Sequence, residues 1–274
     1  SIQFVIPPET ADGTAQLRIC LRNRNGEEVG RNYYDLFLCA RKRTTAEIKA
    51  VRPVWIFDTG VPENTNALRE FLEQCGIAAR QCGNPAELRE SGLLIIPPEL
   101  KPQLLDLADD PILDQWIRNG GILLAFEQKN PESLFPGNLQ LREAGNSFVD
   151  LVIPSHPFFA GLGPMQFDTW NNSDFGFTVH SSFTPYLINA VAVNGPTSGR
   201  TEVDSVLIDA ALGSGRVVLS QFELFDSSPC DSAAALFRHN LLGYLAETKD
   251  LPKNALPLTI VTGKEWSIAP ERIV

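Results

Sequence analysis

Basic residues are scarce in this sequence. Its 23 Lys and Arg stand against 33 Asp and Glu, which gives a net charge of -10. Nucleic-acid binding draws most of its affinity from cationic side chains on phosphates, and anionic membranes also attract cations, so neither partner is expected. The one basic cluster, residues 41–43, is too short to change this expectation and is typical of a solvated linker.

Signals for membrane insertion or export are also missing from the sequence. No run approaches the roughly 20 apolar residues that cross a bilayer, and the N-terminus lacks the charged and apolar regions of a signal peptide. The sequence starts at Ser1 in a strand-like run, without an initiator Met. We therefore expect a piece of a longer protein, and its cellular compartment stays open.

Metal ligands are few as well. The sequence has three His and five Cys, with no Cys-x-x-Cys pair and no His at a ligand spacing. We expect no metal and no cofactor. Cys20 and Cys39 lie in apolar runs and could face each other in a small sheet; buried free thiols are favoured, and whether the two are bonded stays open.

What is present is typical of a globular protein. Hydrophobic residues make up 43% of the 274 positions and charged residues 20%, which predicts one main domain with a smaller appendage. The appendage spans residues 1–46, where strands are expected at 3–6, 17–23 and 33–39, separated by Asp-Gly and Asn-Gly turns. Three strands form a small core, so we expect them to belong to a larger β-sandwich.

From residue 53 onward, predicted strands alternate with predicted helices. Continuous apolar runs are typical of strands buried on both faces, and such alternation predicts right-handed crossovers and a mostly parallel sheet in a three-layer α/β domain. The expected strands are 54–57, 77–82, 93–96 and 122–126, with a helix that stops at Gly76 and another at 112–118.

The rhythm changes after residue 131, where strand-like runs predict an antiparallel extension of the sheet. These runs are 148–153, 186–193, 203–211 and 216–222, with a hairpin turn at 213–215. The last helix is predicted to start at Ser228-Pro229 and to end near Glu247. Residues 251–274 read as a tail with one short strand at 258–261.

Several segments resemble known families. The segment GEEVGRNYYDLFL at 26–38 resembles the immunoglobulin-like sandwich domains that follow the catalytic barrel in glycoside hydrolase family 2 proteins. A longer set of segments resembles class I glutamine amidotransferase-like domains attached to glycosidases. These segments are IPP at 96–98, GGILLAF at 120–126, SHPFFAGL at 155–162 and GSGRVVLSQFEL at 213–224.

These resemblances imply a division into domains and a role. Residues 1–46 would be part of an immunoglobulin-like sandwich, 47–250 a flavodoxin-like (class I glutamine amidotransferase-like) α/β domain, and 251–274 a tail. The implied role is accessory or oligomerising, similar to the trimerisation domain of family 42 β-galactosidases. The implied partners are upstream domains of a parent glycosidase and further copies of the chain.

An active amidotransferase needs a Cys nucleophile on a sharp turn, a His base and an acid that orients the base. The turn after the fourth predicted strand, residues 125–129, reads AFEQK and holds no Cys. Cys230 and His239 are nine residues apart in the last predicted helix, on opposite faces, which rules out a dyad between them. We therefore expect no catalytic residue for thiol chemistry.

Two other chemistries stay open. Glu127 and Glu223 both end predicted strands and could meet above the sheet as the two carboxylates of a glycosidase. The alternative is a structural role, in which they contact solvent or cap helices. An indole can stack on a sugar ring while amides and carboxylates bind its hydroxyls, and a loop holds this combination. Its candidate carbohydrate ligands are Trp170, Asn171, Asn172 and Asp174, with a core anchor as the favoured reading of Trp170.

The leading hypothesis is a non-catalytic accessory or oligomerisation module of a family 2-like glycoside hydrolase. The alternatives are a carbohydrate-binding module that uses Trp170 and a hydrolase that uses Glu127 and Glu223. His156 and His180 have no partner at a metal spacing and read as ordinary loop or strand-end histidines. The substrate of the parent enzyme and the oligomeric state are not predicted by the sequence.

Overall fold

The structure is a computed structural model, and it separates into two compact units, Ser1–Thr44 and Thr45–Val274. Each unit is described by itself. The residues that the structure describes are 13–38, 46–98, 110–128, 140–146, 149–163, 166–167, 179–184, 190–194, 203–225, 232–249, 259–261 and 265–267.

The first unit is a long antiparallel hairpin of β1 (Gly13–Arg22) and β2 (Glu28–Leu38). The predicted Asn-Gly turn is confirmed: Gly26 has φ +82°, and the Asn23 side chain accepts hydrogen bonds from the amides of Asn25 and Glu27. Both strands start earlier in the chain than expected. Cys20 is a free thiol and lies opposite Arg31 in the ladder. The strand expected at 3–6 and Cys39 lie outside the described residues.

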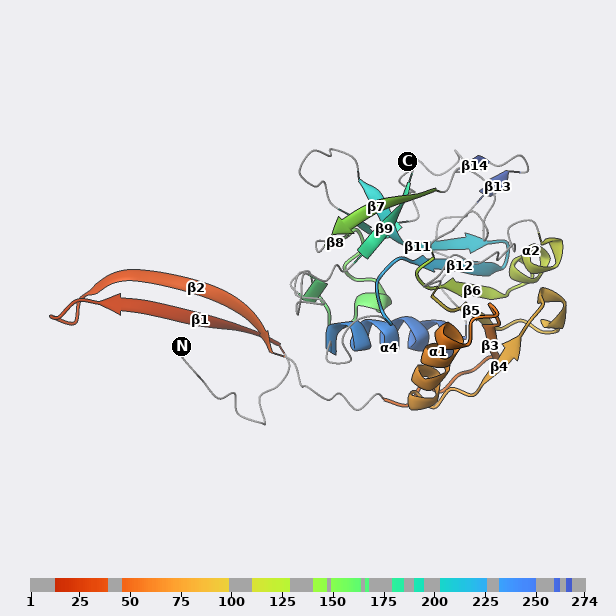
Figure 1. Ribbon diagram of the computed structural model, residues 1–274, viewed down its shortest axis with the longest axis horizontal. Helices are drawn as coiled ribbons and strands as arrows, with labels where there is room; N and C mark the ends of the chain where they lie inside the picture. The colour runs from red at the N-terminus through yellow and green to blue at the C-terminus, as the bar shows by residue number, and fades with distance from the viewer. Residues whose placement is uncertain are drawn as a thin grey trace. The chain divides into compact units, whose positions relative to one another are not determined.

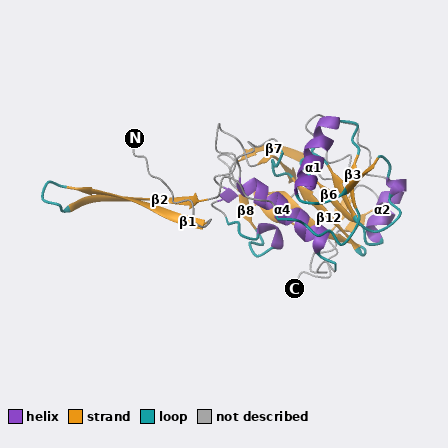
Figure 2. Cartoon of the chain, turned by 90° about the horizontal axis from the view of Figure 1, so that it is seen from below, coloured by secondary structure: helices purple, strands orange, loops and turns teal. Residues whose placement is uncertain are grey.

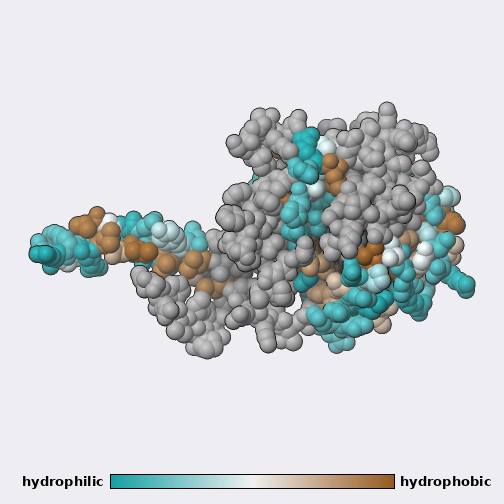
Figure 3. Space-filling model, viewed as in Figure 1, coloured by the Kyte–Doolittle hydropathy of each residue, from teal (hydrophilic) through white to brown (hydrophobic). Residues whose placement is uncertain are grey.

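The two faces of this hairpin differ in polarity, because side chains alternate along a strand. Leu17 lies opposite Tyr34 on one face, and Leu21 on the same face is 64% exposed. The other face carries Arg31, whose guanidinium lies 2.5 Å from the carboxylate of Glu28. Figure 3 shows brown, hydrophobic residues along the ribbon. A two-stranded hairpin is only marginally stable in water, so its apolar face is a surface that gains from being covered.

The second unit is built on one ten-stranded mixed sheet (Figure 1). Its strands are β3 (Val54–Phe57), β4 (Ala79–Cys82), β5 (Leu93–Ile96), β6 (Ile122–Ala125), β7 (Gln140–Asn146), β8 (Val149–Leu151), β9 (Val179–Thr184), β10 (Ala190–Asn194), β11 (Asp204–Leu212) and β12 (Gly215–Ser220). The order is β4-β3-β5-β6-β12-β11-β10-β8, and β7 pairs with β9, which in turn pairs with β11.

Half of this sheet is parallel and half is antiparallel. Each neighbouring pair from β4 to β12 is parallel, whereas β11 is antiparallel to β12, β10 and β9. The predicted α/β class is confirmed. The predicted antiparallel extension is confirmed for β8, β10 and β11, whereas the run 216–222, which was expected in that extension, forms β12 and pairs in parallel with β6. A separate small ladder joins β13 (Thr259–Val261) to β14 (Glu265–Ser267).

Helices cover both faces of the sheet (Figure 2). On one face, α1 (Pro62–Gln74) and α4 (Ser232–Glu247) pack on the sheet through Leu68, Leu72 and Leu241, together with the short 3-10 helix η3 (Pro157–Phe159). On the other face, α2 (Pro111–Arg118) and the 3-10 helix η1 (Pro85–Glu87) lie near Trp55 and Trp116, whose rings meet edge to face at 6.2 Å.

The ends of α2 follow from its sequence. Asp110 caps its start, because the side chain accepts hydrogen bonds from the amides of Ile112 and Leu113. The helix stops at the predicted glycine pair: Gly120 has φ +108°, and a Cβ on Gly121 would lie only 2.4 Å from the Trp116 ring. The helix is thus stopped by backbone geometry and by close packing.

The structure corrects several predicted boundaries. The strand expected at 77–82 starts at Ala79, the run 148–153 shortens to β8, and 186–193 becomes β10. Strands β7, β9 and β14 were not expected. The hairpin turn at 213–215 is confirmed, with Gly213 at φ +62°. The predicted cap of α4, residues 228–229, lies outside the described residues.

Gly243 offers a test of the packing around α4. It lies in the helix interior, where glycine costs about 0.5–1 kcal/mol relative to alanine, and the nearest atom to an added Cβ is 3.9 Å away. We expect Gly243→Ala to raise the free energy of unfolding by about that amount in urea titrations. Gly76→Ala is the contrast, because φ is +74° and the Glu47 side chain lies 2.9 Å from the new Cβ. The free energy of unfolding of Gly76→Ala should fall. If both substitutions stabilised the chain, that result would contradict the packing described here.

Candidate functional site

The carboxyl ends of β6 and β12 lie side by side and carry the two predicted glutamates. The strands are parallel neighbours with Ala125 aligned on Leu219, and each continues past its last strand residue into a buried segment. Glu127 is 9% exposed and Glu223 is 5% exposed. Ligands of open α/β sheets bind outside this edge. Both acids thus follow the ends of neighbouring parallel strands, and their meeting above the sheet and their role as catalysts stay predictions.

A pair of glutamines ties these two strand ends together. The Gln128 amide donates to the side-chain oxygen of Gln221 at 2.8 Å, and the Gln221 side chain donates back to the Gln128 carbonyl at 2.9 Å. The Gln128 side chain also donates to the carbonyls of Pro97 and Phe126. Both side chains are buried. The turn after β6 is thus fixed to β5 and β12 by reciprocal hydrogen bonds, which are strongest where water is excluded.

Glu223 contacts His180, which the sequence predicted to be an ordinary loop or strand-end histidine. Nε2 of His180, on β9, lies 2.6 Å from Oε1 of Glu223. The carboxylate is buried, whereas half of the His180 side chain is exposed. A buried carboxylate that fixes an imidazole is the arrangement by which enzymes and binding sites orient a histidine. This His180–Glu223 pair was missed because its members are far apart in the sequence.

A second polar group lies at the start of β11, the strand that is antiparallel to β12. Asp204 is buried, its carboxylate accepts a hydrogen bond from the Ser182 hydroxyl at 3.2 Å, and it lies 3.6 Å from the guanidinium of Arg142. Arg142 also donates to the Thr184 hydroxyl. These residues come from β7, β9 and β11, where β9 pairs with both β7 and β11. We call Glu127, Glu223, His180, Asp204 and Arg142 the carboxyl-edge cluster.

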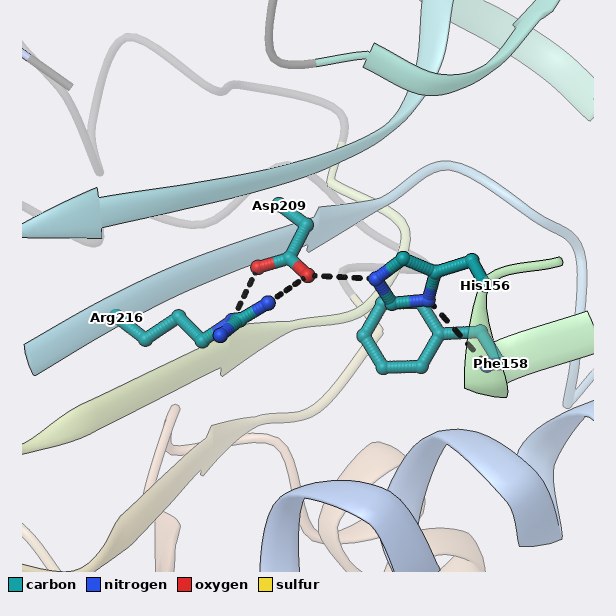
Figure 4. Close-up of polar contacts among 4 residues, drawn as sticks. All are labelled: His156, Phe158, Asp209 and Arg216. Atoms are coloured by element: carbon teal, nitrogen blue, oxygen red, sulfur yellow. Dashed lines mark hydrogen bonds and ion pairs between the residues drawn. The ribbon is translucent and has the colours of Figure 1, made fainter. Parts of the chain in front are cut away.

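A further buried network joins His156, Asp209 and Arg216 (Figure 4). Both carboxylate oxygens of Asp209, on β11, accept hydrogen bonds from the guanidinium of Arg216, on β12. Nε2 of His156 lies 3.1 Å from the same carboxylate, and Nδ1 accepts from the Phe158 amide. An accepting Nδ1 places the proton on Nε2, which therefore donates to Asp209. Both nitrogens of His156 are thus engaged.

Burial and pairing set the titration of this network in opposite directions. Burial by itself raises the pKa of Asp209, but the hydrogen bonds from His156 and Arg216 more than offset it, so the pKa lies below its ordinary value. The pKa of Arg216 is raised, because its bonds to Asp209 outweigh the cost of burial. Tyr244, on α4, lies against the guanidinium, and burial raises its pKa. The network therefore stays charged and acts as a structural ion pair beneath α4.

Two of the described thiols, Cys75 and Cys82, are buried. Burial raises the pKa of Cys75 to about 11 and also raises the pKa of Cys82. A thiolate is the nucleophilic form, so both groups are held in the unreactive state at neutral pH. Cys230 lies outside the described residues, as does Lys129. Within the described ranges, no group of three or more His, Cys, Asp or Glu side chains could hold a metal ion.

The predicted carbohydrate loop lies outside the described residues, with Trp170, Asn171, Asn172 and Asp174. Elsewhere, an open groove of about 530 Å³ lies between residues 88–91, which follow η1, and α2. Trp116 forms part of its floor, and its indole donates to the Glu90 carbonyl at 2.8 Å. In the part of the chain that the structure describes, no helix is long and apolar enough to cross a membrane.

Comparison with known proteins assigns no family. No protein-family model matches the sequence, and no curated protein matches it. The fold is similar to a β-galactosidase from Rahnella sp. R3, with a TM-score of 0.45 and 14% identity over 75% of this chain and 33% of that one. It is also similar to an exo-β-1,4-mannosidase from Opitutaceae bacterium strain TAV5, with a TM-score of 0.37 and 13% identity over 73% of this chain and 37% of that one.

A third similar structure is much shorter. It is a cytoplasmic protein from Salmonella typhimurium, with a TM-score of 0.40 and 12% identity over 85% of this chain and 96% of that one. The chain therefore spans about a third of the β-galactosidase and nearly all of the Salmonella protein.

Proposed function

We propose that the chain is a non-catalytic accessory module of a glycoside hydrolase related to family 2, acting in carbohydrate metabolism. Two features support this. The segments that resemble amidotransferase-like domains of glycosidases fall on β6, η3 and β12, around the sheet edge. The parallel strands, numbered along the chain, have the order 2-1-3-4-5, which is the order of flavodoxin-like folds.

The observation that carries the proposal is the filled turn after β6. A working amidotransferase needs a Cys nucleophile and room for its substrate at this turn. In this chain the turn holds Glu127 and Gln128, and the reciprocal bonds between Gln128 and Gln221 occupy the strand ends. The described thiols that are buried, Cys75 and Cys82, have raised pKa values. Thiol chemistry is therefore absent from the role we propose.

The hairpin fits the same proposal. Its apolar face and its marginal independent stability support a place in a larger immunoglobulin-like sandwich within residues 1–46. Residues 47–250 would then be the flavodoxin-like domain and 251–274 a tail. The partners we propose are the upstream domains of the parent glycosidase and further copies of this chain.

A second candidate function is a hydrolase that uses Glu127 and Glu223. The observation in its favour is that both carboxylates are buried at the ends of neighbouring strands, where two acids could act on a glycosidic bond. A carbohydrate-binding role for Trp170 is a third candidate. Calorimetry with oligosaccharides on Trp170→Ala tests it, since binding should be lost.

Turnover assays separate the first two candidates. We expect the purified 274-residue chain to release no p-nitrophenol from p-nitrophenyl glycosides and no ammonia from glutamine. The reason is that it has no Cys nucleophile at the turn after β6 and no catalytic barrel. The Glu127→Gln variant serves as the matched control. If the unsubstituted chain hydrolyses a glycoside and the Glu127→Gln variant does not, the hydrolase is established and the accessory role is overturned.

A further inference from the structure

We propose that the groove between residues 88–91 and α2 binds a hexuronic acid, a sugar that carries a carboxylate. The ligand class rests on the proposed function, since an accessory module of a glycosidase lies beside an enzyme that acts on carbohydrate. The place of the site and the charge of its ligand go beyond that function. They follow from the lining of the groove, from its fixed walls and from Arg89, which has no partner among the described residues.

The groove has the size of a small-ligand site and a mixed lining. Its volume is about 530 Å³, and ligand pockets span roughly 300–1,000 Å³. The lining residues of α2 and of its C-cap share one helix face through the spacing i, i+3, i+4, i+7. They are Ile112, Gln115, Trp116 and Asn119. Apolar and amide side chains thus alternate along this wall, which suits a pyranose, because the ring has an apolar C–H face and a hydroxyl edge.

Two hydrogen bonds join the walls of the groove. The Trp116 indole donates to the Glu90 carbonyl at 2.8 Å, and the Ser91 hydroxyl donates to the Asn119 carbonyl at 3.3 Å. The Trp116 ring is also packed edge to face against Trp55. The groove is therefore shaped before a ligand arrives, which lowers the entropic cost of binding.

Amide groups on the α2 wall are available to sugar hydroxyls. Nε2 of Gln115 donates to Oδ1 of Asn119 at 3.0 Å. This bond leaves Oε1 of Gln115 and Nδ2 of Asn119 without a partner in the part of the chain that the structure describes, and both side chains are exposed. An amide oxygen accepts and an amide nitrogen donates, whereas a hydroxyl does both. Two neighbouring hydroxyls of a sugar therefore match the two amides.

Charge favours an acidic sugar over a neutral one. Arg89 lines the groove, and its guanidinium makes no hydrogen bond or ion pair with any residue that the structure describes. The other charged lining residue is Glu90, whose carboxylate lies 3.8 Å from the guanidinium of Arg80. The unpaired charge in the lining is thus positive, although the chain carries a net charge of -10. A guanidinium offers a planar fork of donors that matches a carboxylate, and a hexuronic acid joins that group to a hydroxylated ring.

Titration calorimetry at low salt tests the site, with sodium D-glucuronate and sodium D-galacturonate as probes. D-glucose and D-galactose are the neutral comparisons, because they differ from the two probes only at the carboxylate. We expect saturable binding of at least one uronate, about tenfold tighter than its neutral counterpart. Arg89→Gln should weaken uronate binding about tenfold and leave the neutral sugar unchanged. Gln115→Ala should weaken the binding of the uronate as well, since it removes a hydrogen-bonding group for hydroxyls.

Arg69→Gln is the matched control. This arginine of α1 bonds Asn66 and Gln81 and does not line the groove. The control variant should bind the uronate as the unsubstituted chain does. Arg89 is exposed and bonds no described residue, so Arg89→Gln should keep its fold, which circular dichroism checks.

Four results would overturn the hexuronate site. They are no saturable heat from either uronate, equal uronate affinity in Arg89→Gln and in the unsubstituted chain, a neutral sugar that binds as tightly as its uronate, and sodium acetate that binds as tightly as the uronate. Each of these leaves the accessory role intact, because that role depends on the turnover assays. Glycoside turnover by the unsubstituted chain would instead overturn the accessory role, whether or not the groove binds a uronate.

Discussion

Replacing Asp209 with asparagine is expected to lower the free energy of unfolding by about 3–5 kcal/mol. The carboxylate is buried, and both of its oxygens accept hydrogen bonds from Arg216, which is also buried. Asparagine keeps the shape but removes the charge, so the buried guanidinium loses the carboxylate that these two hydrogen bonds join to it. Urea unfolding of the parent chain and the variant, followed by circular dichroism, measures the loss.

Asp114→Asn is the matched control for this effect. Asp114 pairs with Arg118 one helical turn along α2, and both side chains are about 40% exposed. Exposed pairs of this kind contribute about 0.3–0.5 kcal/mol. A double variant, Asp209→Leu with Arg216→Met, should lose less than Asp209→Asn alone, because it leaves no unpaired charge. Similar losses for Asp209→Asn and Asp114→Asn would contradict the buried network.

The cost of Asp209→Asn should also depend on pH. The pKa of Asp209 is lowered in the folded chain, so its contribution is fully present above the ordinary carboxyl pKa and is lost as the pH falls through the folded value. The difference between the parent chain and Asp209→Asn should therefore be largest near neutral pH and shrink in acid. A difference that grows below the ordinary carboxyl pKa would contradict the assigned pairing.

The parallel half of the sheet was predictable because its strands are buried on both faces. The runs at 54–57, 93–96 and 122–126 are almost wholly apolar, and each became a strand within one residue of expectation. Strand β7, with the sequence QLREAGN, and strand β9, with VHSSFT, lack such a pattern. They are strands because a partner pairs with them, and sequence propensity says little about that.

The same distinction explains the candidate site. Glu127 and Glu223 could each be placed at a strand end, because the apolar runs predict where strands finish. That the two strands are parallel neighbours was not predicted, since 216–222 was expected in the antiparallel extension. Their partners could not, since His180 reaches Glu223 from a strand whose path depends on β7 and β11. His156 and Asp209 are 53 residues apart and meet only when η3 packs on α4. A histidine without a local partner in the sequence can thus have a buried carboxylate beside it in the fold.

Phe237→Ala is expected to destabilise the chain by about 3–5 kcal/mol, the range for deleting a fully buried aromatic ring. Phe237, on α4, is 0% exposed and lies with its ring centroid 4.8 Å from that of Phe222 and 5.9 Å from that of Phe159. The ring therefore joins α4 to η3 and to the segment after β12. Thermal and urea unfolding measure the loss, and Leu236→Ala, at a partly buried neighbouring position, should cost less.

The consequence of Phe237→Ala should extend to the carboxyl-edge cluster. Phe222 directly precedes Glu223, so a cavity beside its ring removes packing that fixes the backbone of the His180–Glu223 pair. Phe237→Leu keeps most of the volume and should lose less stability than Phe237→Ala. Equal losses in the two variants would contradict the assignment of this cost to an unfilled cavity.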